Sequence, residues 1–152
     1  MMPKLRILGL LLLGLTISFP AYAQKPQGYA VIASIQGNAE VKPKGAAWSS
    51  AKGGMSVGQG DIIRTRGDSW VVFDIYEGEK RLASVEVRQF SELKLTLLKP
   101  DKSILLDLAL GEAMIKAERL NGGKAKFEVK TPTSFIEVVG KATFSVTVDK
   151  LE

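Results

Sequence analysis

The sequence contains neither cysteine nor histidine. Without a thiol or an imidazole, it lacks the side chains of most nucleophile–base pairs and of most zinc sites. No disulfide can form, so the fold depends on the burial of apolar surface. The sequence also has no calcium-binding loop of the Asp-x-Asp-x-Asp-Gly type. These absences favour a protein that is not an enzyme and that carries neither a metal nor another cofactor.

The first 23 residues have the pattern of a bacterial export signal. Lys4 and Arg6 precede an apolar run at 7–19, which is too short for a membrane-spanning helix of about 20 residues. A small-x-small cleavage site follows, formed by Ala21, Ala23 and Gln24. We therefore expect a helical signal peptide at 1–23 and one domain at 24–152. After cleavage this domain would be periplasmic or secreted and would not span the membrane.

The charge of the expected mature domain is mild. Residues 24–152 contain 19 basic and 16 acidic side chains, because the signal holds two of the 21 basic residues and none of the acidic ones. The net charge is +3, and the basic residues are spread along the chain. A nucleic-acid partner is not expected, since nucleic-acid-binding proteins concentrate their basic residues in a patch or stripe.

Apolar and polar residues alternate in short runs along the mature chain, with Gly, Pro or Asn turns every 8–12 residues. The predicted strands are 29–35, 39–42, 61–66, 69–76, 81–88, 91–98, 103–110, 112–119, 125–130, 134–139 and 142–149. Gly111 is expected to end one of them. Residues 112–119 have good helix propensity, but Ala113, Ile115 and Ala117 alternate with charged residues, which favours a strand. The pattern predicts one all-β domain of short, mostly antiparallel strands, arranged as a sandwich, a roll or a solenoid-like stack.

Several inward-facing positions follow from this alternation. We expect Leu97 to face the core with Leu93 and Leu95, and Leu110 to face it with the other alternating residues of 103–110. The inward face of the last strand should carry Phe144, Val146 and Val148. Trp48 is expected to fold back onto the core.

Some short strings resemble catalytic or phosphate-binding motifs. Ser49 with Lys52, and Ser91 with Lys94, have the Ser-x-x-Lys spacing, but one pair lies in a predicted loop and the other on a predicted strand rather than on a helix. We interpret these residues as solvent-facing. No helix follows the Gly-rich strings, so their glycines are better explained as structural turns. The glycines interpreted in this way are Gly58, Gly60, Gly78 and Gly140. If the first two have positive φ, alanine should be costly there.

Four side chains are candidates for ligand contact. Asp61 follows a Gly-rich corner, where its carboxylate either contacts a ligand or fixes the turn, by accepting backbone N–H bonds or by pairing with Arg64. Trp48 and Trp70 either stack on a sugar ring or serve in packing.

The order of these residues resembles the FecR domain family. The most specific part is Gly-x-Gly-Asp-x-Ile-Arg-Thr at 58–65. The rest of the pattern is carried by Gly37, Trp48, 54–57, Ser69, Gly78, 91–95, 106–108, Gly111, 127–132 and Val139-Gly140. One departure lies near the end of the chain. The family usually shows Arg-Gly-Thr-x-Phe there, whereas 139–144 has one more residue between Gly140 and Phe144.

The resemblance implies an exported, β-rich module. In iron-uptake regulators such modules form the periplasmic part of a transmembrane sensor, which receives a signal from an outer-membrane transporter and controls a sigma factor. This chain shows neither the anti-sigma segment nor the membrane helix of such a sensor, so we expect the module alone. The expected function is non-catalytic contact with an envelope protein through a strand edge or loops. The alternatives are a glycan- or cell-wall-binding module and an envelope lipid-binding β-jellyroll.

Overall fold

The computed structural model describes residues 28–99, 103–118 and 126–150. Within these residues the chain forms strands and no helix, which confirms the all-β prediction. The strands are β1 (Gly28–Gln36), β2 (Ala39–Lys42), β3 (Ser49–Ser50), β4 (Ser56–Val57), β5 (Ile62–Thr65), β6 (Trp70–Glu77), β7 (Lys80–Val87), β8 (Glu92–Lys99), β9 (Ser103–Ala117), β10 (Lys126–Lys130), β11 (Phe135–Val139) and β12 (Ala142–Val148). The expected signal peptide and its cleavage site lie outside the described residues.

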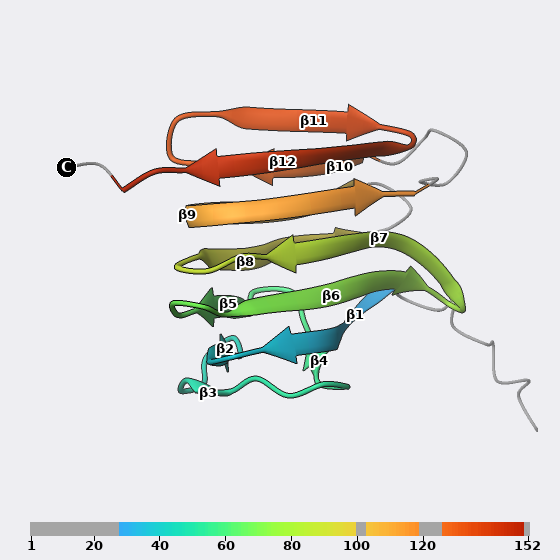
Figure 1. Cartoon of the computed structure of the whole chain (residues 1–152). Coiled ribbons are helices and arrows are strands. Elements are labelled where there is room, and N and C mark those ends of the chain that lie inside the picture. The colour runs from blue at the N-terminus through green and yellow to red at the C-terminus, as the bar shows by residue number, and fades with distance from the viewer. Residues whose placement is uncertain (1–27, 100–102, 119–125, 151–152) are drawn as a thin grey trace, which may run out of the picture.

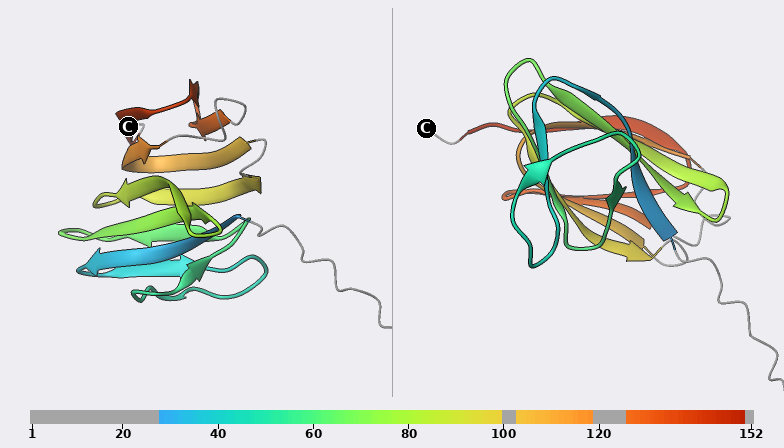
Figure 2. Two further views of the ribbon diagram at one scale, coloured as in Figure 1. Left: turned by 90° about the vertical axis from the view of Figure 1, so that its right-hand side faces the viewer. Right: turned by 90° about the horizontal axis from the view of Figure 1, so that it is seen from below.

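The strands form a curled sheet that folds over into two facing layers. Sheet A has the order β4-β1-β6-β7-β9-β12, and sheet B has the order β3-β2-β5-β8-β9-β10-β11. All pairs are antiparallel except β9 with β10. In Figure 1 the strands are stacked in levels, and most levels hold one strand of each sheet, such as β6 with β5 and β7 with β8. The two further views in Figure 2 show the layers enclosing the interior.

The two layers share β9, a strand of 15 residues. Its first half pairs with β8 and β10 in sheet B, and its second half pairs with β7 and β12 in sheet A. The prediction that Gly111 ends a strand is therefore wrong. Gly111 has φ +91°, and it bends β9 from one sheet into the other while pairing continues on both sides. Ala113 and Ile115 are fully buried, so the strand interpretation of this segment is confirmed.

The inward side chains of both sheets form one core. Phe73 from sheet A and Phe127 from sheet B are its largest fully buried side chains. Leu97 was expected among the inward residues, but the pairing of β8 with β9 shifts register between Leu95 and Leu97. As a result Leu98, rather than Leu97, packs against the core. The simple alternation fails here because a bulge adds one residue to the strand.

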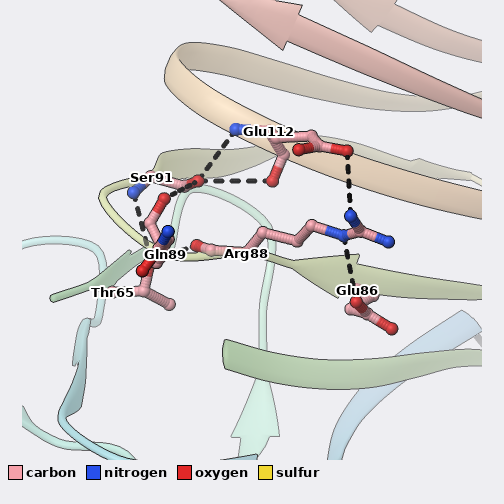
Figure 3. A network of polar contacts seen from close by, with 6 residues as sticks. All are labelled: Thr65, Glu86, Arg88, Gln89, Ser91 and Glu112. Atoms are coloured by element: carbon pink, nitrogen blue, oxygen red, sulfur yellow. Dashed lines mark hydrogen bonds and ion pairs between the residues drawn. The ribbon is translucent and has the colours of Figure 1, made fainter. Parts of the chain in front are cut away.

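Where the chain crosses between the sheets, adjacent corners are joined by hydroxyl groups. Ser91 lies at the corner between β7 and β8, and its Oγ accepts a hydrogen bond from the backbone N–H of Glu112 at 2.9 Å (Figure 3). The backbone N–H of Ser91 donates to Thr65 Oγ1 at 3.0 Å, and that hydroxyl donates to the carbonyl of Arg88. Three successive corners of the stack are thus bonded to one another.

The same device occurs one step along the stack, where Ser69 Oγ accepts the backbone N–H of Asn38 at 2.8 Å. Each serine faces a glycine with positive φ on the neighbouring corner. A Cβ on Gly37 would lie 2.4 Å from Ser69 Oγ, and a Cβ on Gly111 would lie 2.1 Å from Ser91 Oγ. Real Cβ atoms do not approach other atoms so closely, so these two corners require glycine.

Candidate binding site at the open end of the stack

Two of the predicted site residues, Trp48 and Arg64, meet on the outer face of sheet B. The Arg64 guanidinium lies over the Trp48 ring, 3.9 Å from its centroid, in a cation–π arrangement. Arg64 also donates from Nε and Nη2 to Glu40 Oε2, at 3.1 and 2.9 Å. These hydrogen bonds, with the nearby charges of Arg64 and Arg66, hold the pKa of Glu40 below its ordinary value of 4.5. The expectation that Trp48 folds onto the core is therefore wrong, because it stacks on Arg64 at the surface.

Asp61 lies apart from this cluster. Its carboxylate accepts backbone N–H bonds from Gly58 at 2.7 Å and from Lys44 at 2.9 Å. Both oxygens of this buried group are thus used to fix the turn, and the carboxylate pairs with backbone rather than with Arg64. Of the two glycines of this corner, Gly60 has a positive φ of +91° and Gly58 does not. Gly58 serves the turn through its N–H group, so the cost expected for alanine at positive φ applies to Gly60 alone.

Trp70 lies on the outer face of sheet A, so the two tryptophans are not brought together. It is half-buried at the edge of a shallow hollow of about 350 Å³. The other residues of this hollow are polar and are Gln36, Asp68, Ser69, Glu86, Arg88 and Gln89.

The remaining predicted turns, Gly78 and Gly140, both have positive φ, at +60° and +89°. Of the two Ser-x-x-Lys serines, Ser91 is buried in the corner network and was wrongly expected to face solvent.

A site that the residue patterns did not single out lies at the C-terminal end of the stack. There β10 pairs with the first half of β9 in sheet B, and β12 pairs with its second half in sheet A, so each sheet gains one strand beyond β9. β11 then adds a further strand to sheet B only. Sheet B therefore extends one strand beyond sheet A at this end. In Figure 1 β11 lies beyond the level of β12, with no described strand beside it in sheet A.

The outer edge of β12 pairs with none of the described strands, and its sequence, Ala-Thr-Phe-Ser-Val-Thr-Val, contains no charge, no proline and no glycine. Proteins usually protect free edges with lysine, proline, a bulge or a very short strand. The edges at the opposite end of the stack follow that rule, because β3 and β4 have only two residues each. β12 has seven residues and none of these protections.

Apolar side chains line the space beside β12. Phe144 and Val148 on β12, and Ile136 and Val138 on β11, pack against the core but are only partly buried. This space continues into a pocket of about 700 Å³, which lies between the turn at 131–134, the end of β12 and Leu110. Its volume is in the range typical of ligand sites, about 300–1,000 Å³. On the outer face of β11, Phe135 and Val139 are 58% and 55% exposed.

Two lysines mark one end of the β12 edge. Lys141 precedes the strand, and Lys116 lies on β9 opposite Thr143. Both are exposed, and neither forms an ion pair with the residues that the structure describes. At the other end of β12, Glu112 is paired with Arg88 at 3.3 Å. Asp149 and Lys150, directly after β12, are also exposed and outside these ion pairs, and their opposite charges offset each other. The net unpaired charge beside the edge is therefore positive and lies near the start of β12.

Sequence alternation predicted β11 and β12 as strands but did not reveal that one sheet is a strand shorter than the other. The available signal was the absence of charge in β12.

Comparisons with protein-family models, with curated proteins and with solved structures found no match. Among the described residues there is no helix that could cross a membrane and no cluster of acidic side chains that could hold a metal ion.

Proposed function

We propose that this protein is an exported, non-catalytic module that binds another protein of the cell envelope at the C-terminal end of its stack of strands, beside β11 and β12. We call this region the open end. The observation that carries the proposal is the uncharged seven-residue edge of β12, with which no described strand pairs and which is flanked by partly buried apolar side chains. Such an edge offers unpaired backbone groups to an incoming chain, and the apolar side chains provide area to bury. The FecR resemblance adds the suggestion that this contact belongs to envelope signalling.

The test is capture from a native envelope extract by immobilised residues 24–152, with mass spectrometry as the readout. In Val138→Lys, a charge enters the apolar space beside β12. In the matched control, Val139→Lys, the same charge is placed one residue away, on the opposite face of β11. We expect the first variant to lose the captured protein and the second to retain it. Equal capture by both folded variants would contradict the proposal.

A second candidate function is glycan binding at Trp70. The hollow beside it combines a half-buried indole, on which a sugar ring could stack, with amide, carboxylate and guanidinium groups that could hydrogen-bond its hydroxyls. Retention of the mature domain on peptidoglycan or polysaccharide, lost on Trp70→Ala, would favour this function. Retention unchanged by Trp70→Ala would exclude this site as its cause. Co-purified lipid, displaced by Val138→Lys, would instead identify the open end as a lipid site.

A further inference from the structure

Sheet A ends one strand short of sheet B, and this difference indicates what fits the open end. Resting on the proposed function, we infer that the partner contributes one extended strand, which pairs antiparallel with β12 and lies opposite β11. One strand would give the two sheets equal numbers, since sheet A would then have a member facing β11. It would also cover the inward side chains of Ile136 and Val138, which no described strand of sheet A now faces.

A second copy of this chain fits the vacancy less well. If two molecules paired through their β12 edges to continue sheet A, each sheet B would extend one strand, about 4.8 Å, past the junction. The β11 strand of each molecule would then occupy the level already filled by β10 of the other. A single strand from a different protein avoids this overlap.

The direction of the strand follows from the sheet that it joins. Every described pair in sheet A is antiparallel, and the only parallel pair, β9 with β10, belongs to sheet B. Antiparallel pairs are also slightly more stable per residue. A strand antiparallel to β12 would begin beside Val148 and end beside Ala142.

The surroundings of β12 define the side chains that this strand should carry. Its inward residues would meet Phe144, Val138 and the other apolar side chains of the open end, so they should be apolar and β-branched. Its outward residues would lie beside Thr143, Ser145 and Thr147, which are exposed. Threonine or serine suits these positions, because cross-strand hydroxyl pairs are favourable.

Charge complementarity sets the end of the strand. In the antiparallel direction its C-terminal end would lie beside Lys141 and near Lys116, where the unpaired charge is positive. An acidic residue at that end would be stabilised, and a lysine there would be repelled. The inferred ligand is thus an uncharged segment of about seven residues, alternating apolar and hydroxyl side chains, that ends in an acidic residue.

The experiment uses the mature domain and a synthetic peptide of alternating valine and threonine with a C-terminal aspartate. Hydrogen exchange measured by NMR should slow on the order of tenfold at those β12 amides that point away from β9, and not at amides of the opposite end, such as that of Ser50. Of two peptides N-methylated at alternate residues, one in each phase, the peptide that lacks the N–H groups facing β12 should have no such effect, because it cannot donate to the β12 carbonyls. Unchanged exchange in β12 with the unmodified peptide would overturn the inference.

Two protein variants separate the strand from its charge and from the proposed function. Lys141→Glu should lower the affinity for the aspartate-ended peptide roughly threefold and raise the affinity for a lysine-ended one, whereas Lys94→Glu on sheet B should change neither affinity. No preference between the two peptides would refute the assigned direction. If Val138→Lys abolishes capture of an envelope protein while the captured partner leaves β12 exchange unchanged, the proposed function stands and strand addition is wrong. If the peptide protects β12 but capture is insensitive to Val138→Lys, the proposed function fails instead.

Discussion

Replacing Gly111 by alanine tests the corner that joins the two sheets. Gly111 has φ +91°, and an added Cβ would lie 2.1 Å from Ser91 Oγ and 2.5 Å from Ser91 Cα. The nearer contact can be relieved by rotating a side chain, but the second involves backbone and cannot. The substitution therefore has to displace one corner from the other and disturb the bonds from Ser91 to Glu112 and Thr65.

Two terms contribute to the expected loss of stability. An alanine at positive φ costs about 1–2 kcal/mol relative to glycine. Overlap with a packed neighbour typically costs another ~1–3 kcal/mol. We expect Gly111→Ala to lower the free energy of unfolding by about 2–5 kcal/mol, a large part of the ~5–15 kcal/mol of a typical domain.

Gly140 provides the matched control, because it has nearly the same φ, +89°, with no atom within 4 Å of an added Cβ. Gly140→Ala should therefore lower the free energy of unfolding only by the cost of alanine at positive φ, about 1–2 kcal/mol. The free energies of both variants can be measured by urea unfolding of residues 24–152, with Ser91→Ala as a milder change at the same corner. Equal losses for Gly111→Ala and Gly140→Ala, within about 0.5 kcal/mol, would refute the argument from contact with Ser91.

Two further predictions concern the polar groups of the N-terminal half. Asp61→Ala leaves two backbone N–H groups without their acceptor, so it should lower the free energy of unfolding in urea by about 2–3 kcal/mol. Asp61→Asn keeps one acceptor and should cost about half as much. Equal losses would argue against the paired bonds to Gly58 and Lys44. The pKa of Glu40 is lowered in the folded protein, so its pairing with Arg64 stabilises the fold above the unfolded pKa, and this contribution disappears as the pH falls through the folded pKa. The difference in melting temperature between the wild type and Glu40→Gln should therefore shrink below pH 4.5 and vanish in stronger acid, and a difference that is constant with pH would contradict this assignment.

Alternation and turn residues were sufficient to predict most of the strands, because each inward face is buried and an error of one residue would expose it. They failed where a strand departs from simple pleating. A bulge moved Leu98 inward in place of Leu97, and glycine bent β9 at Gly111 without ending it. The candidate site could not be predicted in the same way, since a free edge depends on which strands pair. Pairing is decided by contacts between residues distant in sequence, and a pattern of local alternation carries no information about it.

The open end arises from one change in how the chain climbs the stack. At earlier levels the chain crosses between the sheets at corners, so each level receives one strand of each sheet. Because β10 is parallel to the first half of β9, it again ends on the side of the stack where the chain has crossed between the sheets. There the chain forms a turn instead of crossing. Thr131 closes this turn by donating its backbone N–H to the Ser134 carbonyl at 2.9 Å and by accepting the Ser134 N–H at Oγ1. The chain returns along sheet B as β11 and reaches sheet A only afterwards, as β12. Sheet B therefore gains two strands where sheet A gains one, and the pocket lies beside the turn that takes the place of a corner. The same short segment, Thr-Pro-Thr-Ser at 131–134, thus accounts for both the free edge of β12 and the space in front of it.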